Sequence, residues 1–385
     1  MGIVASGIGR KSVLLWVALL AQLGPASGGV AAPPQTQERH LLYAAVPGIR
    51  NYLELGGAGI LVFDMDRNHA FVKRIETPAS RANKPENIKG ICANAGTQRL
   101  YFTTLTKLYC LDLLSEKTLW ERALSGGCDR MALTPDGKVL YVPSLESTHW
   151  HVVDAASGDV ITKIVPESGA HNTVCSLDGT CAYLAGLKSP LLTVVDAKTQ
   201  KVGQPVGPFS APIRPFTVNA AKTLCFVNVN GLLGFEIGDL TTGKMLHRVE
   251  VQGFQQGPVK RHSCPSHGVG LTPNEKELWV CDAANSRMHV FDATVMPPKQ
   301  TVSMLLRDQP GWITFSLDGR YAYPSTGEIV DTRTKKIVTA LQDEKGREVH
   351  SEKMVEVVFK GDVPVRTGDQ FGLGRAGAAG RGACR

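Results

Sequence analysis

The sequence lacks the short motifs that identify the common nucleophilic, phosphate-binding and zinc-dependent enzymes. It contains no GxSxG, no GxxxxGK[ST] and no HExxH. These absences disfavour a hydrolase of the nucleophile-elbow type, a P-loop enzyme and a zincin. The nine cysteines form no CxxC pair, so a zinc ribbon or a thioredoxin-type site is not expected.

The sequence also lacks a strong excess of charge of either sign, with 42 Lys and Arg residues against 35 Asp and Glu residues. The formal net charge is +7 over 385 residues, and part of it lies in Arg and Lys at the two ends, so nucleic acid is not an expected partner. Apolar residues make up 43% of the chain and charged residues 20%, which is ordinary for a soluble globular protein with a large core. The 40 glycines favour a turn-rich all-β chain.

The N-terminus holds an apolar run, 13–20, that is too short to span a membrane comfortably. Two basic residues precede it and small residues follow it. This pattern predicts a signal peptide over 1–32, cleaved between Ser27 and Ala32; an uncleaved anchor is the alternative. We therefore expect an exported protein, periplasmic or secreted, that is monomeric and has no stable membrane span after cleavage.

An exported chain permits disulfide bonds. The cysteine count is odd, so at least one thiol stays reduced or pairs between chains. Cys175 and Cys181 flank the turn 176–180, which makes them the most plausible bridge. The alternative is that both thiols are simply buried in neighbouring strands.

A unit of strand, polar turn and strand recurs along the chain. Two examples are "MALTPDGKVLYVPS" and "FSLDGRYAYPST", and each unit continues into a third and a fourth strand, as in "HVVDAASGDVITKIV". The spacings between successive units are about 40, 42, 43, 53 and 44 residues, a period that predicts a β-propeller rather than unrelated hairpins in a sandwich. The aligned turn residues are Gly96, Asp136, Asp178, Ala221, Asn274 and Asp318.

The two ends of the chain supply the parts of one further unit. The N-terminal segments "LLYAAV", "GILVFDMD" and "AFVKRIE" match second, third and fourth strands, and the C-terminal "MVEVVFKG" is a lone strand. Pairing them closes the ring and removes two exposed edges. We expect an all-β, seven-bladed propeller of four-stranded blades over 33–361, followed by a Gly/Arg-rich tail, 362–385, without fixed structure.

The units resemble the YVTN-type seven-bladed propellers, through "TPDGKVLYV" followed by "VVDAASG". That superfamily also contains the lactonase-like propellers related to 6-phosphogluconolactonase and the muconate-cyclising enzymes. The resemblance covers about 40–360 and implies a polar axial channel as the ligand site. Propeller enzymes of this kind include lactonases, which use carboxylate, His and Arg, and polysaccharide lyases, which pair His and Arg or Tyr around a uronate. Neither catalytic set maps completely onto this sequence.

Charged and imidazole side chains recur seven positions before the aligned turn residue. Because inner strands run along the axis, these residues should ring one end of the channel. Buried charge is costly unless it is paired or hydrated, and a water-filled channel supplies hydration; the alternative is that such strand starts merely line a wet channel. The positions are occupied by Lys89, Asp129, His171, Arg214, His267 and Gly311.

Such a set can bind an anion and move a proton near neutral pH. We expect His171, His267 and Arg214 to be catalytic, with one histidine as the base and the other as the acid. Lys89 and Asp129 are expected to bind substrate, with Lys89 assisting Arg214 on a carboxylate.

The longest spacing contains an insertion within "QGFQQGPVKRHSCPSH". Its Arg261 and His262 should overhang the same mouth, because long loops on one face of a repeat fold often bind ligands; a purely solvated loop is the alternative. The segment 350–353 should reach the same rim, and His350 is its predicted substrate-binding residue. No cofactor and no metal ligand is predicted, although two histidines with Asp129 offer donors for a divalent ion.

Two functions follow from these expectations. The first is an exported enzyme that acts on a small anionic or carbohydrate ligand in the channel, by lyase-type β-elimination or by lactone hydrolysis. The second is a non-catalytic cell-envelope propeller that binds a ligand or serves as a scaffold. A carboxylate–histidine pair at the base of a pocket favours the enzyme, and a shallow, flat face favours the scaffold.

Overall fold

The described part of the chain is built almost entirely from β-strands. The computed structural model describes residues 2, 37–368 and 384. The predicted signal peptide over 1–32 and most of the predicted tail therefore lie outside the described residues. The described residues form 28 strands and one 3-10 helix, η1 (Met65–Arg67). The expected all-β class is confirmed.

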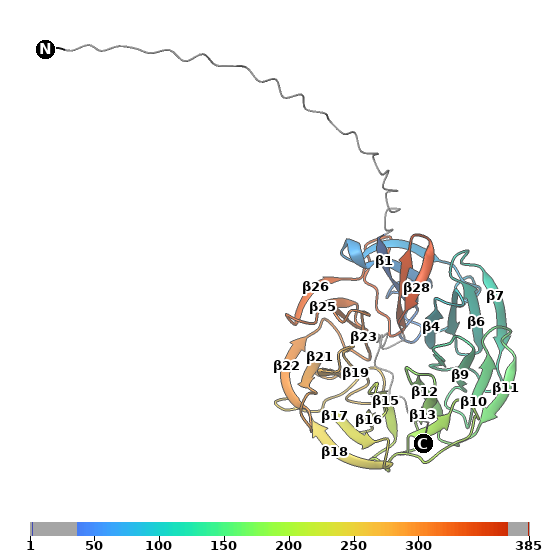
Figure 1. The fold of residues 1–385 in the computed structure, drawn as a ribbon, viewed down its shortest axis with the longest axis vertical. Helices are drawn as coiled ribbons and strands as arrows, with labels where there is room; N and C mark the ends of the chain where they lie inside the picture. The colour runs from blue at the N-terminus through green and yellow to red at the C-terminus, as the bar shows by residue number, and fades with distance from the viewer. Residues whose placement is uncertain (1, 3–36, 369–383, 385) are drawn as a thin grey trace. The chain divides into compact units, whose positions relative to one another are not determined.

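The strands form seven antiparallel sheets that surround a common axis as the blades of a propeller (Figure 1). Blade 1 combines both ends of the propeller, in the order β28-β27-β1-β2-β3. Its strands are β1 (Glu38–Val46), β2 (Gly59–Asp64), β3 (Ala70–Ile75), β27 (Met354–Lys360) and β28 (Val363–Thr367).

The other six blades follow in chain order. Blades 2 and 3 contain β4 (Gly90–Asn94), β5 (Arg99–Thr103), β6 (Lys107–Asp112), β7 (Thr118–Ala123), β8 (Ala132–Leu133), β9 (Val139–Pro143), β10 (Trp150–Asp154) and β11 (Val160–Ile164). Blades 4 and 5 contain β12 (Ala170–Cys175), β13 (Cys181–Gly186), β14 (Thr193–Asp196), β15 (Ile213–Val218), β16 (Leu224–Val229), β17 (Gly234–Asp239) and β18 (Lys244–Glu250). Blades 6 and 7 contain β19 (Val269–Leu271), β20 (Glu277–Asp282), β21 (Arg287–Asp292), β22 (Lys299–Leu305), β23 (Ile313–Phe315), β24 (Tyr321–Pro324), β25 (Glu328–Asp331) and β26 (Lys336–Ala340).

The turn between the first and second strands is shaped by a side chain at the aligned position. In blade 3, Thr134 Oγ1 donates a hydrogen bond to Asp136 Oδ1 at 2.6 Å, and the same oxygen accepts the backbone N–H of Lys138 at 3.1 Å. Short polar side chains that bond nearby backbone favour turns over strands. The arrangement recurs around Asp178, Asn274 and Asp318.

Apolar side chains fill the space between neighbouring blades. The middle strands are almost fully buried, and every residue of β2 and β13 is buried, whereas the outer strand β18 alternates between exposed and half-buried residues. One cluster packs Tyr101 and Leu108 of blade 2 against Val142 and Val153 of blade 3. Each blade is therefore held by burial against both of its neighbours.

The closing strand lies where the sequence predicts. β27 pairs with β1 in antiparallel register from Glu38 opposite Lys360 to Ala44 opposite Met354, and β1 pairs with β2 on its other side. The inner position of blade 1 is thus filled from the C-terminal end of the propeller, which closes the ring.

Two details of the sheets differ from the expected four strands per blade. Blade 1 has a fifth strand, because β28 turns back and pairs with β27. The propeller therefore continues beyond the predicted boundary at 361. In blade 4 the expected fourth strand is reduced to two bridges, Leu192 with Val206 and Val195 with Val202. Glycine and proline between 203 and 208 disfavour a regular strand there.

The predicted bridge between Cys175 and Cys181 is wrong. The two residues lie on adjacent strands of blade 4, as expected, but Cys181 forms a disulfide bond with Cys384, whose Cα lies 5.4 Å away. The bridge spans 203 residues of sequence. The sequence gives no local signal for a partner so distant, and the short turn between Cys175 and Cys181 suggested the nearer one.

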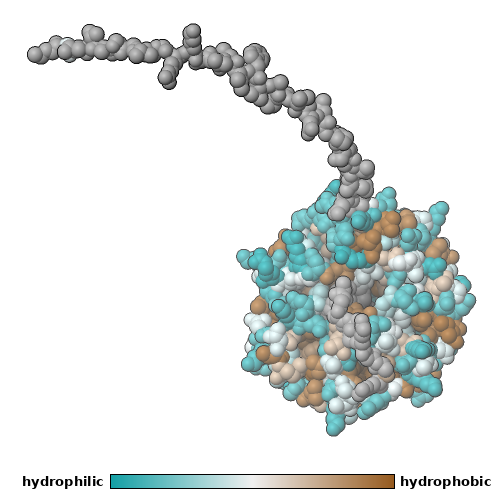
Figure 2. Space-filling view, viewed as in Figure 1, coloured by the Kyte–Doolittle hydropathy of each residue, from teal (hydrophilic) through white to brown (hydrophobic). Residues whose placement is uncertain are grey.

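The surface of the described propeller mixes hydrophilic and hydrophobic residues on the face seen in Figure 2. Exposed apolar residues occur mainly on the outer strands, among them Leu119, Ile161 and Ile337, and isolated exposures of this kind are normal. In the described residues, no helix combines the length and the apolar character needed to cross a membrane.

Truncation after Glu348 should open the ring. It removes β27 and exposes the buried face of β1, and each buried valine of β27 contributes roughly 2 kcal/mol. Because Val355, Val357 and Val358 are all fully buried, the loss is a large part of the total stability of a domain. We expect a much lower Tm, or no cooperative transition, in a thermal melt. Truncation after Gly368 is the matched control, since it keeps β27 and β28; equal melting of the two proteins would contradict ring closure.

The disulfide makes a separate prediction. Mass spectrometry of unreduced peptides should recover Cys181 linked to Cys384. In the loop-entropy description a bridge over this separation contributes about 5 kcal/mol, so Cys384→Ser should lower the midpoint of chemical denaturation. A peptide that links Cys175 to Cys181 would overturn the assignment.

Candidate functional site

The starts of the inner strands surround a polar cavity of about 470 Å³ at one end of the propeller axis. In Figure 1 the strands β4, β12, β15, β19 and β23 lie nearest the axis. Five of the ring positions precede or begin these strands, and the sixth, Asp129, precedes β8. The structure brings together all five predicted ring side chains. The residues that line this axial cavity include Lys89, Asp129, His171, Arg214 and His267.

Asp129 is the centre of a buried charge cluster. Its Oδ2 lies 2.6 Å from His171 Nδ1 and its Oδ1 lies 3.1 Å from Lys89 Nζ. Burial alone would raise the pKa of Asp129, but the positive charges of Lys89 and His171 and their hydrogen bonds outweigh it and hold the pKa below its usual range. Asp129 is therefore a fixed carboxylate that orients the imidazole of His171.

A second buried carboxylate, Glu352, stands two residues before β27. Its Oε2 lies 3.2 Å from Arg130 Nη2 and 2.8 Å from Lys353 Nζ, and its backbone carbonyl accepts a further bond from Arg130 Nη1 at 3.2 Å. The guanidinium of Arg130 stacks on the ring of Trp312, 3.2 Å from the ring centroid. Hydrogen bonds and stacking together fix this arginine and hence the carboxylate.

Glu352 and Lys353 influence each other's protonation. Burial would raise the pKa of Glu352, but the charges of Lys353, His262 and Arg130 hold it well below its usual range. Burial lowers the pKa of Lys353 to about 8, although Glu352 opposes that change. The pair is ionised at neutral pH because each charge is compensated within the cavity wall.

His267 lines the cavity but is almost fully buried. Its Nδ1 lies 3.1 Å from the carbonyl oxygen of Gly311, and a carbonyl only accepts, so Nδ1 carries a proton. The ring stacks on His262, with centroids 4.3 Å apart and an interplanar angle of 18°. Burial, reinforced by His262, lowers the pKa of His267 well below its usual value. His267 is therefore neutral and its Nε2 carries a lone pair.

Arg214 supplies a positive charge from the start of β15. Its Nε donates to Asn230 Oδ1 at 2.5 Å, which orients the guanidinium and leaves its terminal nitrogens for a ligand. Neither Arg214 nor the nearby Arg50 forms an ion pair with another described residue. Both line the cavity.

Of the three predicted substrate-binding residues outside the ring, only His262 lines the cavity. Arg261 Nη1 lies 2.7 Å from Asp308 Oδ2, and its guanidinium lies over the ring of Tyr52. His350 is buried, with its Nδ1 4.0 Å from the same carboxylate. Arg261 is therefore paired with Asp308, whereas the hydrogen-bond partner of His350 is Glu348, whose Oε2 lies 3.3 Å from His350 Nε2.

Glu352, Lys353 and Arg130 were missed as individual site residues. The sequence predicts the segment 350–353 at the rim and His350 as its ligand-binding residue, whereas Glu352 and Lys353 are the residues of this segment that line the cavity. The position of Glu352 is the signal that identifies it: it stands two residues before its inner strand, as His267 stands before β19 and Gly311 before β23. Glu352 therefore completes the ring in blade 1. Arg130 gave no such signal, because it neighbours a ring position and reaches across the axis.

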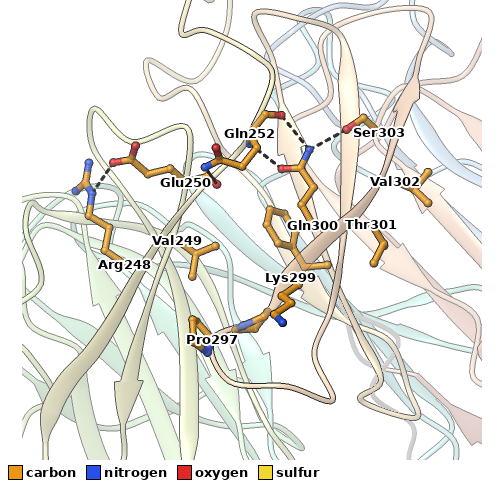
Figure 3. A pocket seen from close by; sticks show the side chains of 12 residues that line it. Arg248, Val249, Glu250, Gln252, Pro297, Lys299, Gln300, Thr301, Val302 and Ser303 are labelled. Carbon is orange, nitrogen blue, oxygen red and sulfur yellow. Dashed lines mark hydrogen bonds and ion pairs between the residues drawn. The ribbon is translucent and has the colours of Figure 1, made fainter.

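A second hollow, of about 500 Å³, lies between β18 and β22 at the outer edge of the propeller (Figure 3). Gln300 accepts the backbone N–H of Gln252 at 2.8 Å and donates to Ser303 Oγ at 3.1 Å, while Arg248 pairs with Glu250 at 3.0 Å. These polar groups satisfy one another, so the hollow presents no set of groups prepared for a ligand.

Comparison with known proteins supports the architecture. The chain matches no family model, and it matches no curated protein. It is similar in structure to a chain of hydrazine synthase from Kuenenia stuttgartiensis, with 17% sequence identity and a TM-score of 0.53, over 66% of this chain and 80% of that one. Similarity at that level of identity shows the fold alone. The protein is a seven-bladed β-propeller with a charged axial cavity.

The buried position of Arg130 predicts a large effect on stability. Arg130→Gln should lower the free energy of unfolding by about 3 to 5 kcal/mol, because it removes a partner from a buried carboxylate. Arg122→Gln is the matched control. Arg122 also lies near a tryptophan, Trp120, and near a carboxylate, Asp159, but its side chain is 41% exposed, so we expect a change of about 1 kcal/mol or less. Equal effects in chemical denaturation would contradict the structural role of Arg130.

Proposed function

We propose that this protein is an exported propeller enzyme of the YVTN-type, lactonase-like group, and that its axial cavity binds a small anionic, sugar-derived ligand. The observation that carries the proposal is the Asp129–His171 pair, which lines the same polar cavity as Arg214. A carboxylate–histidine pair in a pocket favours an enzyme, whereas a non-catalytic scaffold requires no such pair.

Asp129 prepares His171 to act as a base. The 2.6 Å contact with Asp129 occupies His171 Nδ1, so a neutral imidazole keeps its lone pair on Nε2. The carboxylate also stabilises the imidazolium that forms when Nε2 takes up a proton. Lys89, on the other oxygen of Asp129, keeps that carboxylate ionised.

The charge of the cavity favours an anion. Five cationic side chains line it against three carboxylates: Arg50, Lys89, Arg130, Arg214 and Lys353 against Asp129, Glu146 and Glu352. Arg130 and Lys353 are engaged by Glu352. Arg214 and Arg50 remain for a ligand carboxylate, and a guanidinium binds a carboxylate through two parallel hydrogen bonds.

Both candidate reactions begin with proton removal by His171. In elimination from a uronate, Nε2 takes the proton next to the carboxylate, the electron pair forms the carbon–carbon double bond, and the bond to the leaving oxygen breaks. That oxygen takes a proton from solvent, and Arg214 stabilises the charge that develops on the carboxylate. In lactone hydrolysis, Nε2 takes a proton from water and the hydroxide adds to the carbonyl. The ring ester bond then breaks as its leaving oxygen takes that proton back from the imidazolium.

Export is part of the proposal. The charged, apolar and small-residue segments of 1–32 follow the signal-peptide pattern. The disulfide between Cys181 and Cys384 supports an oxidising compartment, where such bonds persist. Cell fractionation of the tagged protein tests this part separately from catalysis.

The test of the activity is a screen of the purified protein against uronate polysaccharides and lactones. Ultraviolet absorbance of the unsaturated product reports elimination, and acid release reports hydrolysis. On the substrate that responds, Asp129→Asn and His171→Gln should lower kcat/KM by about 10² to 10⁴, the usual contribution of a positioned base. His247→Gln, on the outer strand β18, is the control and should keep full turnover.

The screen also separates the enzyme from the scaffold. Turnover that survives His171→Gln would remove His171 from the mechanism. Saturable binding of uronates without turnover of any substrate would favour the non-catalytic propeller, with Arg214→Gln then expected to weaken binding.

A further inference from the structure

The axial cavity contains a second group of side chains that the proposed reaction does not use. We call His262, His267 and Glu352 the His–His–Glu triad. One nitrogen from each imidazole and one carboxylate oxygen all lie within 4.8 Å of one another. They come from the loop before β19, from the start of blade 6 and from the segment before β27.

The hydrogen bond of His267 prepares its other nitrogen as a ligand. Nδ1 donates to the carbonyl of Gly311, which fixes both the tautomer and the ring plane. A histidine that binds a metal typically donates its remaining ring N–H to a carbonyl or carboxylate in this way. Nε2 of His267 is left with an unshared electron pair.

Glu352 is oriented in the same manner. Its Oε2 is held by Arg130 and Lys353, while Oε1 has no hydrogen-bond partner among the described residues although it is buried. Oε1 lies 2.9 Å from His262 Nε2, and that nitrogen also lacks a hydrogen-bond partner of acceptable geometry in the described part of the chain. Two ligand atoms that each lie about 2.1 Å from one metal are about 3 Å apart when they occupy adjacent positions.

The backbone is shaped to bring these groups together. His262 and the next residue, Ser263, have φ of 68° and 51°, in the left-handed region that non-glycine residues seldom adopt. At Gly311 a Cβ would lie 2.6 Å from Glu352 Oε1 and closer still to His262 Nε2. Only glycine at 311 therefore allows the chain to approach both side chains.

We propose that the His–His–Glu triad binds a divalent first-row transition metal ion through His262, His267 and Glu352. Two imidazoles and one carboxylate are a donor set that such ions favour, and three protein ligands leave coordination positions for water or for a ligand. The cations Arg130 and Lys353 contact Glu352 only at Oε2, which leaves Oε1 for the metal. An anionic ligand in the cavity would balance the positive charge of the metal ion. This inference goes beyond the proposed reaction, because metal binding is measured without any substrate.

Asp129 is not part of this site, contrary to the donor set suggested by the sequence. Both of its oxygens are occupied, by Lys89 and His171. The carboxylate that faces the two stacked imidazoles is Glu352.

The test uses the full-length purified protein after removal of metals with EDTA. Titration with Co²⁺, followed by visible absorption, and with Zn²⁺, followed by calorimetry, should give binding of one ion per chain. His262→Ala and His267→Ala should each weaken the affinity by about tenfold or more, the effect expected from disturbing a metal site. His247→Ala removes an imidazole from β18 and is the matched control, with affinity unchanged.

A variant that keeps all three ligands gives an independent check. Gly311→Ala places a methyl group against His262 and Glu352, so it should weaken Co²⁺ binding while circular dichroism reports an intact fold. If the contact between His262 and Glu352 is only an ion pair, the wild-type protein will bind no stoichiometric Co²⁺ or Zn²⁺, and the proposal fails. Equal affinities in wild type, His262→Ala and His267→Ala would also overturn it.

The reaction and the metal site are separable by one further variant. Asp129→Asn should leave metal affinity unchanged, because Asp129 contacts none of the three ligands through an ion pair or hydrogen bond among the described residues. Loss of Co²⁺ binding in Asp129→Asn, measured on folded protein, would contradict the assignment of the ligands to Glu352 and the two stacked histidines.

Discussion

The pairing of β27 with β1 is the constraint on which the site depends. It joins the two ends of the propeller into one sheet and thereby fixes the position of every blade around the axis. Because each blade begins at the same height, the residues just before the inner strands converge from all directions. The closing strand also brings its own contribution, Glu352, into the ring formed by the other blades. Without ring closure the cavity would lack this carboxylate.

The charges of the cavity are arranged as two separate units. In one, Asp129 holds Lys89 and His171; in the other, Glu352 holds Arg130 and Lys353. Each carboxylate has enough partners to remain ionised without bulk water, so burial does not neutralise it. This division leaves different atoms for a ligand: the Nε2 of His171 next to the first unit, and Glu352 Oε1 with two imidazoles next to the second.

Periodicity made the fold and most of the ring predictable. A repeat near 40 residues specifies the blades, and its register specifies which residues share a height on the axis, so five ring side chains were located without any structure. The remaining residues depend on contacts that no period records. Arg261 pairs with Asp308, Arg130 reaches Glu352, and Cys181 pairs with a residue 203 positions away. Long-range pairing of this kind follows from the assembled fold.

The two histidines that the register placed together are given opposite tasks by their hydrogen bonds. His171 Nδ1 faces a carboxylate, which stabilises the protonated imidazole and suits a group that accepts a proton. His267 Nδ1 faces a backbone carbonyl in a buried, stacked position, which keeps the ring neutral and suits a group that donates an electron pair. The ring centroids are only 6.2 Å apart. A ligand anchored by Arg214 would thus meet a base on one side and a lone-pair donor on the other, and the difference arises from the acceptor behind each ring.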